Sequence, residues 1–405
     1  MSGKDCCSKI SIVGGSYREI CYWPDWKYLF GSGWRAVRVF RAFSPNTEIS
    51  FYSVGDEQLQ RMMKVFANSE QLKPFITPSD STIGFAYSHP LSSPVIIGGL
   101  ANQLSLEADG KHVIGFGMLE ALVKITGEYV VYDPQSPTHP LSFKQQGGKA
   151  VHLALVMNET EAKALSGESE LHAIRDSLFE REKCDCLVIK RGAKGATVFH
   201  SIDDEGTSIP VFKTTHVWPI GSGDVFTIVF AYHWFNGYSP EESAMKASKA
   251  VAAYCESLGS YEELSQHLKD VFPEHKPRKQ GNVYLAGPFF TMNEKRFVTE
   301  CRNILKAMDV TVFSPYHDVG EGEAEDVVPK DIEALDVCDC VFAIVDGLDS
   351  GTLFEIGYAV AKGKKVVAYV ENETEGALKM LKGTGCEIES DFTTAVYKTI
   401  WNATE

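Results

Sequence analysis

The chain of 405 residues contains no stretch of about 18 consecutive apolar residues, so we expect no transmembrane helix. Its first seven residues lack the apolar core of a secretory signal peptide, and a cytoplasmic protein is the default expectation. An excess of positive charge is absent too: the formal net charge is −15, which argues against a nucleic-acid partner. Small phosphorylated ligands stay compatible with this charge, because helix N-termini and backbone amides bind phosphate locally.

The ten cysteines also lack the spacing of a disulfide-rich domain, and we expect them to be reduced. Two Cys-Asp-Cys triplets, at Cys184/Cys186 and Cys338/Cys340, each lead into a strand-like run. Alternate positions on a strand place both thiols on one face, where burial as small side chains is favoured over zinc binding. Zinc sites more usually carry Cys-x-x-Cys pairs, so we predict no dedicated metal site.

The length favours two or three domains, and the polar, proline-broken segment 273–281 is typical of a linker. We therefore predict one domain over residues 1–272 and a second over residues 282–405. In both, strand-like runs alternate with helical patterns, which indicates an α/β fold whose mainly parallel sheets are covered by helices. The pattern of the second domain predicts a smaller, doubly wound parallel sheet.

A glycine-rich turn in the first domain, Gly221-Ser222-Gly223, is followed by Asp224 and a helical pattern over residues 225–236. Free backbone N–H groups and the helix dipole at such a turn stabilise the charge of a phosphoryl group. An aspartate just inside the helix can accept the proton of an attacking hydroxyl. The alternative is a structural glycine turn whose aspartate only supports the helix dipole.

Two further segments precede this turn, so that the chain contains in order Asn158-Glu-Thr-Glu161, Lys190-Arg-Gly-Ala-Lys-Gly195 and Gly221-Ser-Gly-Asp224. In order and spacing they resemble the ribokinase-like (pfkB) family of carbohydrate and nucleoside kinases. The resemblance implies a ribokinase-like α/β/α fold with Asp224 as catalytic base and the anion hole at Gly221, Ser222 and Gly223. It also implies that Asn158 and Glu161 place magnesium and phosphates, with ATP and Mg²⁺ as cofactors if the domain is an active kinase.

The first domain departs from the family pattern at three places. Trp218-Pro219 stands where the family usually has Asp-Thr, and Gly31-Ser-Gly33-Trp-Arg35 lacks the usual asparagine. The substrate-binding aspartate is replaced by Glu19 or is absent. Two hypotheses therefore stay open for this domain: a kinase for a nucleoside or sugar, and a retained binding or scaffold domain.

Residues 17–43 hold nine aromatic side chains, including Trp23, Trp26 and Trp34. A nucleobase could stack on such rings. We favour an aromatic lid or dimer interface, because exposed apolar patches commonly mark contact sites.

Carboxylates gather around the strand-like run 341–345 of the second domain. Asp346 and Asp349 follow the run, Glu355 lies in the next helical pattern, and Asp331 lies in the preceding one. In an open α/β sheet, ligands bind at this carboxyl edge of the strands. Glycoside chemistry needs a carboxylate nucleophile, together with groups that position the sugar and protonate the leaving group. The alternative is a set of solvated loop acids.

The second domain contains four ordered segments, Tyr284-Leu-Ala-Gly-Pro-Phe-Phe290, Ser314-Pro-Tyr-His-Asp318, Lys330-Asp-Ile-Glu-Ala-Leu-Asp336 and Asp346-Gly-Leu-Asp-Ser-Gly-Thr-Leu-Phe-Glu355. They resemble the nucleoside 2-deoxyribosyltransferase family, whose fold is flavodoxin-like or Rossmann-like. The resemblance implies Glu355 as nucleophile on C1′, without a cofactor. The implied substrate-binding residues are Asp331, Asp349, Tyr284, Gly287, Pro288, Ser350 and Gly351. Because a neighbouring subunit often completes such sites, a homo-oligomer is expected, with Asn402 as a weak candidate for the C-terminal contribution.

Both resemblances point to nucleosides, nucleobases or sugars as small-molecule partners. The leading hypothesis is an enzyme of nucleoside salvage that transfers a 2-deoxyribosyl group between bases. One alternative is a hydrolase of deoxynucleosides or their 5′-monophosphates with a degenerate kinase domain. Another is a non-catalytic nucleotide sensor.

Overall fold

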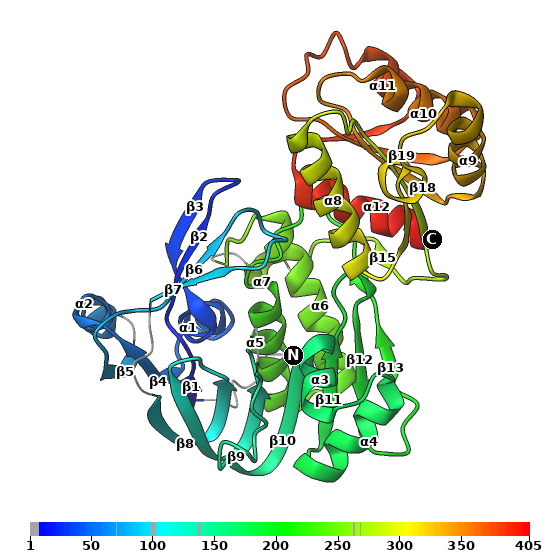
Figure 1. The fold of residues 1–405 in the computed structure, drawn as a ribbon. Coiled ribbons are helices and arrows are strands. Elements are labelled where there is room, and N and C mark those ends of the chain that lie inside the picture. Colours follow the sequence, from blue (N-terminus) through cyan, green and yellow to red (C-terminus); the bar gives the residue numbers. More distant parts are fainter. Residues whose placement is uncertain (1–7, 70, 99–102, 137–138, 262–263, 268) are drawn as a thin grey trace. The chain divides into compact units, whose positions relative to one another are not determined.

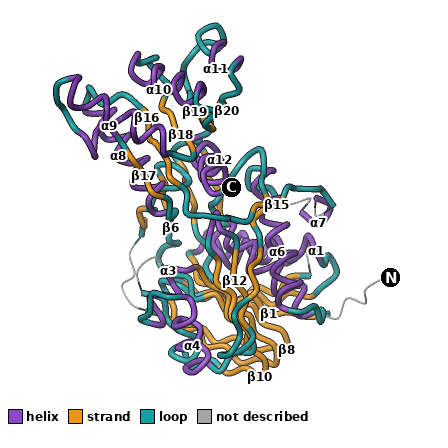
Figure 2. Tube along the Cα trace, turned by 90° about the vertical axis from the view of Figure 1, so that its right-hand side faces the viewer, coloured by secondary structure: helices purple, strands orange, loops and turns teal. Residues whose placement is uncertain are grey.

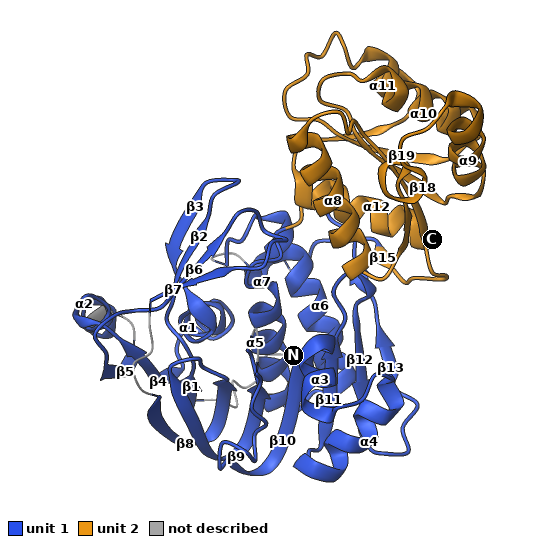
Figure 3. Ribbon diagram, viewed as in Figure 1, with its two compact units in different colours: residues 1–214, 218–273 blue, residues 215–217, 274–405 orange. Residues whose placement is uncertain are grey.

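The computed structural model describes residues 8–69, 71–98, 103–136, 139–261, 264–267 and 269–405. Two compact units make up the chain (Figures 1 and 3): unit 1 comprises residues 1–214 and 218–273, and unit 2 comprises residues 215–217 and 274–405. In the part of the chain that the structure describes, no helix combines the length and apolar character that crossing a bilayer requires.

The main sheet of unit 1 has nine strands in the order β13-β12-β11-β10-β9-β8-β1-β4-β5 among the described residues. The pairs from β11 to β5 are parallel, and β12 and β13 add an antiparallel edge. Figure 2 draws the strands in orange. The strand bounds are β1 (Lys9–Val13), β4 (Glu48–Gly55), β5 (Leu72–Pro78), β8 (Leu104–Phe116), β9 (Ala121–Asp133), β10 (Lys149–Asn158), β11 (Cys186–Lys190), β12 (Ala196–Phe199) and β13 (Thr207–Ile209).

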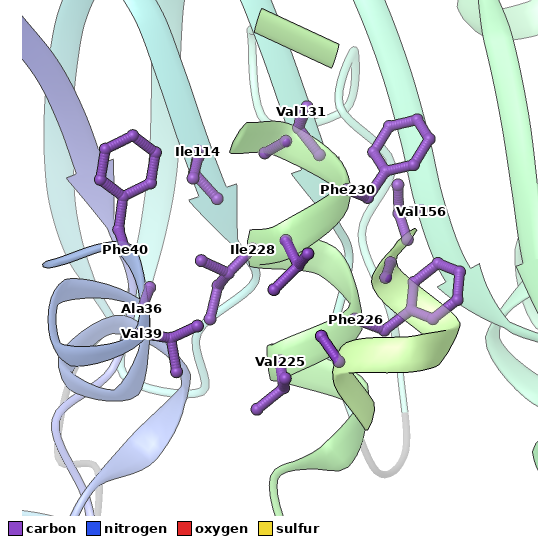
Figure 4. Close-up of a cluster of buried hydrophobic side chains, with 14 of the residues drawn as sticks. Ala36, Val39, Phe40, Ile114, Val131, Val156, Val225, Phe226, Ile228 and Phe230 are labelled. Atoms are coloured by element: carbon purple, nitrogen blue, oxygen red, sulfur yellow. The ribbon is translucent and has the colours of Figure 1, made fainter. Parts of the chain in front are cut away.

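Helices cover both faces of this sheet. Because successive side chains of a strand point to opposite faces, alternate strand residues enter two different cores. Val131 of β9 belongs to one core, with Phe230 of α5 (Figure 4), whereas its neighbours Val130 and Tyr132 belong to the other, with Leu178 of α4. Each fully buried apolar side chain contributes about 1.5–3 kcal/mol. The helix bounds are α1 (Gly31–Phe43), α2 (Glu57–Ser69), α3 (Glu159–Ser166), α4 (Leu171–Glu182), α5 (Ser222–Phe235), α6 (Pro240–Glu256) and α7 (Leu264–His267).

A smaller four-stranded sheet, in the order β3-β2-β6-β7, contains part of the aromatic segment. Trp23, which follows β2, is 60% exposed, whereas Trp34 and Phe40 of α1 are buried in the core. The predicted aromatic surface is therefore wrong for the helical half of the segment, where the helix turns its rings inward. The strands are β2 (Arg18–Cys21), β3 (Trp26–Leu29), β6 (Gly84–Tyr87) and β7 (Val95–Ile97), and unit 1 also contains β14 (Val211–Phe212) and the 3₁₀ turn Gly192–Lys194.

Unit 2 is built on a five-stranded sheet in the order β17-β16-β18-β19-β20, in which every pair is parallel. Counted along the unit, this is the flavodoxin-like order 2-1-3-4-5, which confirms the predicted doubly wound sheet and places its topological switch point between β16 and β18. The elements are β15 (Glu274–His275), β16 (Asn282–Ala286), α8 (Met292–Ala307), β17 (Thr311–Phe313), a π-helical turn (Pro315–Val319), α9 (Ala324–Val337), β18 (Cys340–Ile344), α10 (Ser350–Ala361), β19 (Lys365–Tyr369), α11 (Lys379–Gly383), β20 (Glu387–Glu389) and α12 (Phe392–Thr404).

Candidate active sites

The candidate site of unit 2 lies at the switch point of its sheet. Glu355 stands in α10, whose first turn is capped by Asp349: the Asp349 carboxylate accepts hydrogen bonds from the backbone N–H of Thr352 at 2.8 Å and from its hydroxyl at 2.9 Å. Tyr284 of β16 donates its hydroxyl to Oε1 of Glu355 at 2.6 Å. The cap orients the helix, and the neighbouring strand positions the carboxylate.

The surroundings of Glu355 favour its protonated form. Burial raises the pKa of Glu355 to about 7, the Tyr284 hydrogen bond opposes this rise, and the charges of Asp331 and Asp349 add to it. Burial and the charge of Glu355 raise the pKa of Tyr284, so the phenol remains a hydrogen-bond donor. A carboxyl group that titrates near neutrality is a frequent property of functional sites.

The remaining predicted residues of unit 2 lie along the same sheet edge. Gly287 and Pro288 directly follow β16, and Ser350 and Gly351 open α10. Asp331 lies in α9, where burial raises its pKa and its Oδ1 is buried without a hydrogen-bond partner among the described residues.

Asp346 differs from the other carboxylates at this edge, because its oxygens are used by the backbone. They accept hydrogen bonds from the N–H groups of Glu371 and Asn372 at 2.9–3.1 Å. The interpretation of Asp346 as part of the reactive cluster is therefore wrong: it ties the loop after β18 to the loop after β19.

An aromatic surface beside the β16 loop was missed by the sequence analysis. Phe289 stacks on Phe290 and Tyr316 with ring-centroid distances of 5.6 and 5.5 Å, and Phe290 is 72% exposed. The Phe289-Phe290 pair directly after Gly287-Pro288 was the available signal. Such rings offer a flat surface on which a nucleobase can stack.

The candidate site of unit 1 is a cavity of about 470 Å³. The structure brings together all the residues predicted for this domain, since the cavity is lined by Asn158, Glu161, Gly221, Ser222, Gly223 and Asp224. Gly221 caps α5 with φ +79°, a left-handed conformation that favours glycine. Glu19, the uncertain substitute for the family aspartate, also lines the cavity.

One part of the cavity wall is formed by Lys190 and Asp133, which sequence analysis did not single out as site residues. Nζ of Lys190 lies 2.6 Å from Oδ2 of Asp133 and 3.4 Å from the carbonyl oxygen of Gly223. Burial raises the pKa of Asp133 despite Lys190, and its Oδ1 has no partner among the described residues. The signal that marked both is their position at the carboxyl ends of β11 and β9.

The Asn158–Glu161 motif has a structural role that is visible in its hydrogen bonds. Oδ1 of Asn158 accepts the N–H of Glu161 at 2.8 Å, and Oε2 of Glu161 accepts the N–H of Asn158 at 2.9 Å. This reciprocal capping box starts α3. Burial and the charge of Asp133 raise the pKa of Glu161 to about 7, so the motif also places a titrating carboxyl group in the cavity wall.

A second missed residue, Arg35 of α1, joins Glu19 and Asp224. Its Nη2 lies 2.5 Å from Oε2 of Glu19, and its Nη1 lies 2.5 Å from Oδ2 of Asp224. Oδ1 of Asp224 accepts a further hydrogen bond from Gln135. The only signal was the arginine at the end of Gly31-Ser-Gly33-Trp-Arg35, where the resemblance led us to look for an asparagine.

Comparisons with known protein families follow the division into units. A family model described as pfkB family carbohydrate kinase matches residues 97–267, and one described as nucleoside 2-deoxyribosyltransferase matches residues 283–392. Asn158, Glu161 and Asp224 lie within the first match, whereas Glu19 and Arg35 precede it. The first match and the helix-covered sheet of unit 1 confirm the predicted ribokinase-like fold.

No curated protein matches the chain. Among solved structures, a ribokinase from Thermotoga maritima is 18% identical with a TM-score of 0.46, and the match covers 64% of this chain and 99% of that one. A putative ribokinase II from E. coli is 15% identical with a TM-score of 0.48, covering 65% and 100%. A pyrophosphate-dependent kinase in the ribokinase family is 11% identical with a TM-score of 0.45, covering 64% and 99%.

Proposed function

The chain joins a segment of the pfkB carbohydrate kinase family to a segment of the nucleoside 2-deoxyribosyltransferase family, and from this premise we propose that unit 2 transfers a 2-deoxyribosyl group between nucleobases. The hydrogen bond between Tyr284 and Glu355 at the switch point carries the proposal. In the first step, a Glu355 oxygen forms a bond to C1′ while the bond from C1′ to the base breaks. A second base then attacks C1′ and releases the carboxylate.

Glu355 is suited to be the nucleophile because one of its oxygens is held and the other is free. Oε1 accepts the Tyr284 hydroxyl, and Oε2 makes no hydrogen bond among the described residues. With a pKa of about 7, the carboxyl group is ionised in about half of the molecules at neutral pH. Partial burial also removes water that would otherwise compete for the free oxygen.

The departing base needs a proton, and Asp331 is the better placed of the two candidate aspartates. Burial raises the pKa of Asp331, which favours its acid form, and its Oδ1 has no hydrogen-bond partner in the described chain. Asp349 already uses Oδ2 to cap α10. We assign the proton to Asp331 and nucleoside positioning to Asp349, with the base stacked beside Phe289.

The test is chromatography of the protein incubated with thymidine, with and without free adenine. Formation of deoxyadenosine only in the presence of adenine establishes the transfer reaction. Release of thymine at the same rate without adenine replaces it by hydrolysis, with water as acceptor. No reaction of thymidine or of its 5′-monophosphate contradicts the role of Glu355 and favours a nucleotide sensor.

Two variants make this test specific to the site. Glu355→Ala removes the proposed nucleophile, and we expect it to retain nucleoside binding while losing turnover. Glu333→Ala removes the same charge from an exposed position of α9 and is the matched control. Equal activity of the two variants argues against a covalent intermediate on Glu355.

A second candidate function concerns unit 1, which we propose to bind a magnesium–nucleotide. The side chains fit such a ligand: Lys190 and the Gly221–Gly223 backbone would hold phosphates. Glu161 would face the cation together with Oδ1 of Asp133, which has no hydrogen-bond partner in the described part of the chain. Bound ATP and Mg²⁺ would supply a transferable phosphoryl group. Phosphorylation of a nucleoside or sugar requires in addition that Asp224 accept a hydroxyl proton.

A further inference from the structure

Arg35 is a buried cation, 2% exposed, in the wall of the unit 1 cavity. We propose that its guanidinium group takes the place of a hydroxyl acceptor, so that unit 1 binds a magnesium–nucleoside triphosphate without phosphorylating a second substrate. The proposal rests on nucleotide binding by unit 1, the second candidate function above. It would make unit 1 a nucleotide-binding unit attached to a deoxyribosyltransferase.

The carboxylates that a polyol or nucleoside would use are already paired within the chain. Oδ2 of Asp224 accepts from Arg35 and Oδ1 accepts from Gln135. Oε2 of Glu19 accepts from Arg35 and Oε1 accepts the N–H of Gly31 at 2.9 Å. All four oxygens therefore have internal donors, whereas a general base needs an oxygen directed at the hydroxyl proton of the substrate.

Arg35 also holds Asp224 in a charged pair. Although burial opposes the charge of Arg35, Glu19 and the other neighbouring groups raise its pKa well above the ordinary value, so the guanidinium stays charged. Asp224 would have to break a 2.5 Å ion pair before it could accept the proton of an acceptor.

Packing fixes the guanidinium in this position. A Cβ atom placed on Gly221 would lie 2.3 Å from Cζ of Arg35, so the missing side chain at Gly221 leaves the room that Arg35 occupies. The guanidinium also lies over the ring of Phe30, at 4.9 Å from the ring centroid. Movement of Arg35 out of the site would leave Glu19 and Asp224 buried without their cation.

Other groups that line the same cavity are not paired with Arg35. Lys190 pairs with Asp133 rather than with Asp224, and the second oxygen of Asp133 has no partner among the described residues. Glu161 adds a carboxyl group to the cavity wall, where its Oε2 accepts the backbone N–H of Asn158. These groups fit phosphates with a divalent cation. Unit 1 therefore keeps the groups for nucleotide binding, while the group for phosphoryl transfer, Asp224, is paired with Arg35.

The test compares the unmodified protein with the double variant Arg35→Asn/Glu19→Gln, which removes one charge of each sign. The probes are Mg·ATP alone and Mg·ATP with ribose, 2-deoxyribose or thymidine. Calorimetry measures binding of Mg·ATP, and ³¹P NMR detects a phosphate ester. Arg38→Asn is the matched control, because Arg38 lies on the same helix and bonds Tyr261 instead.

We expect the unmodified protein and Arg38→Asn to bind Mg·ATP and to form no ester. In the double variant, Asp224 is freed to take the hydroxyl proton, the acceptor oxygen bonds to the γ-phosphorus, and ADP leaves. We expect ester formation at least about tenfold above the unmodified protein, because a positioned general base contributes about 10²–10⁴-fold.

Three results would overturn the proposal. Ester formation by the unmodified protein that is lost in the double variant makes Arg35 a catalytic or acceptor-binding residue. Absence of ester in both proteins shows that Arg35 is not what prevents transfer, and absence of Mg·ATP binding in the unmodified protein removes the ligand. Deoxyribosyl transfer measured on the same samples separates these failures from a failure of the function proposed for unit 2.

A measurement on the unmodified protein alone covers the case in which the double variant does not fold. An open acceptor site would couple the two ligands, so each pentose or thymidine would tighten Mg·ATP binding. We expect the Kd of Mg·ATP to change less than about twofold with these compounds. A larger tightening contradicts a closed acceptor site.

Discussion

Asp224 of unit 1 and Glu355 of unit 2 are both proposed reactive carboxylates in the first two turns of a helix at a sheet edge, yet their surroundings are opposite. Asp224 is paired with a buried arginine and a glutamine, and both of its oxygens are occupied. Among the described residues, Glu355 receives one hydrogen bond, from an uncharged phenol, and burial raises its pKa to about 7. A carboxylate at the same kind of position is therefore bound to a cation in unit 1, whereas in unit 2 it is hydrogen-bonded to an uncharged group.

The difference teaches that a motif identifies where chemistry is possible, while the partners of its side chain decide whether it occurs. A cation hydrogen-bonded to a carboxylate occupies the oxygen that would otherwise take the proton of a substrate hydroxyl. A buried phenol orients a carboxylate without cancelling its charge. Only the second arrangement leaves an anionic oxygen for attack on carbon.

The largest expected effect comes from replacing Glu355 by Gln, which keeps the shape but removes the nucleophile. We expect deoxyribosyl transfer to fall by at least about 10³-fold, equivalent to about 4 kcal/mol of transition-state stabilisation. Single-turnover measurement of base release checks this. A decrease of less than tenfold would contradict the role of Glu355 as nucleophile, and the proposed difference between Glu355 and Asp224 would no longer hold.

Replacing Arg35 by Asn should produce the next largest effect, on stability rather than on deoxyribosyl transfer. Glu19 and Asp224 would remain buried without their cation, and breaking buried ion pairs in this way costs about 3–5 kcal/mol. Urea unfolding followed by tryptophan fluorescence reports mainly on unit 1, because only Trp401 of the six tryptophans lies in unit 2. The double variant with Glu19→Gln should recover part of the loss, and an unchanged midpoint would show that the ion pairs are not structural.

Tyr284→Phe should change the pH dependence of the proposed reaction. Transfer needs ionised Glu355, so activity should rise with pH through about 7 in the unmodified protein. Loss of the hydroxyl removes the interaction that lowers this pKa, so the rise should move to higher pH and the loss of activity should be about tenfold at pH 6 but small at pH 9. A parallel decrease at every pH would assign Tyr284 to substrate binding alone.

Asp331→Asn should have the smallest effect on the same titration and in the opposite direction. Where Asp331 is ionised, its charge raises the pKa of Glu355, so its removal should move the rise in activity to lower pH by less than about one unit. Loss of its acid form, the proposed proton donor, should in addition lower the whole profile. The height of the profile reports separately on proton donation to the base. A rise that moves upward in pH would show that Asp331 acts on Glu355 by something other than its charge.

Much of the fold and of both sites follows from local sequence. The helix after Gly221 begins at the predicted glycine turn, and the doubly wound sheet of unit 2 follows from its alternating strands and helices. The position of Glu355 at a carboxyl edge follows from the same alternation. Such features depend on neighbours along the chain, which a sequence displays directly.

Other features could not be read in this way. The aromatic segment was predicted as one surface, but Trp34 lies in the core because α1 turns that face toward the sheet. Asp346 was grouped with the reactive carboxylates, although its oxygens bond the loop after β19. In both cases the type of side chain indicated which contacts it can make, but the direction in which it points depended on packing.

Periodicity and motif spacing are local properties, and they are enough to predict two α/β units, the family resemblance of each and the sheet edges at which their carboxylates lie. Tertiary structure alone decided the partners of those carboxylates. Arg35 and Asp224 are 189 positions apart and Tyr284 and Glu355 are 71 apart. Such pairs form only when strands and helices pack in register, and that packing leaves Asp224 bound to a cation and Glu355 hydrogen-bonded to an uncharged phenol.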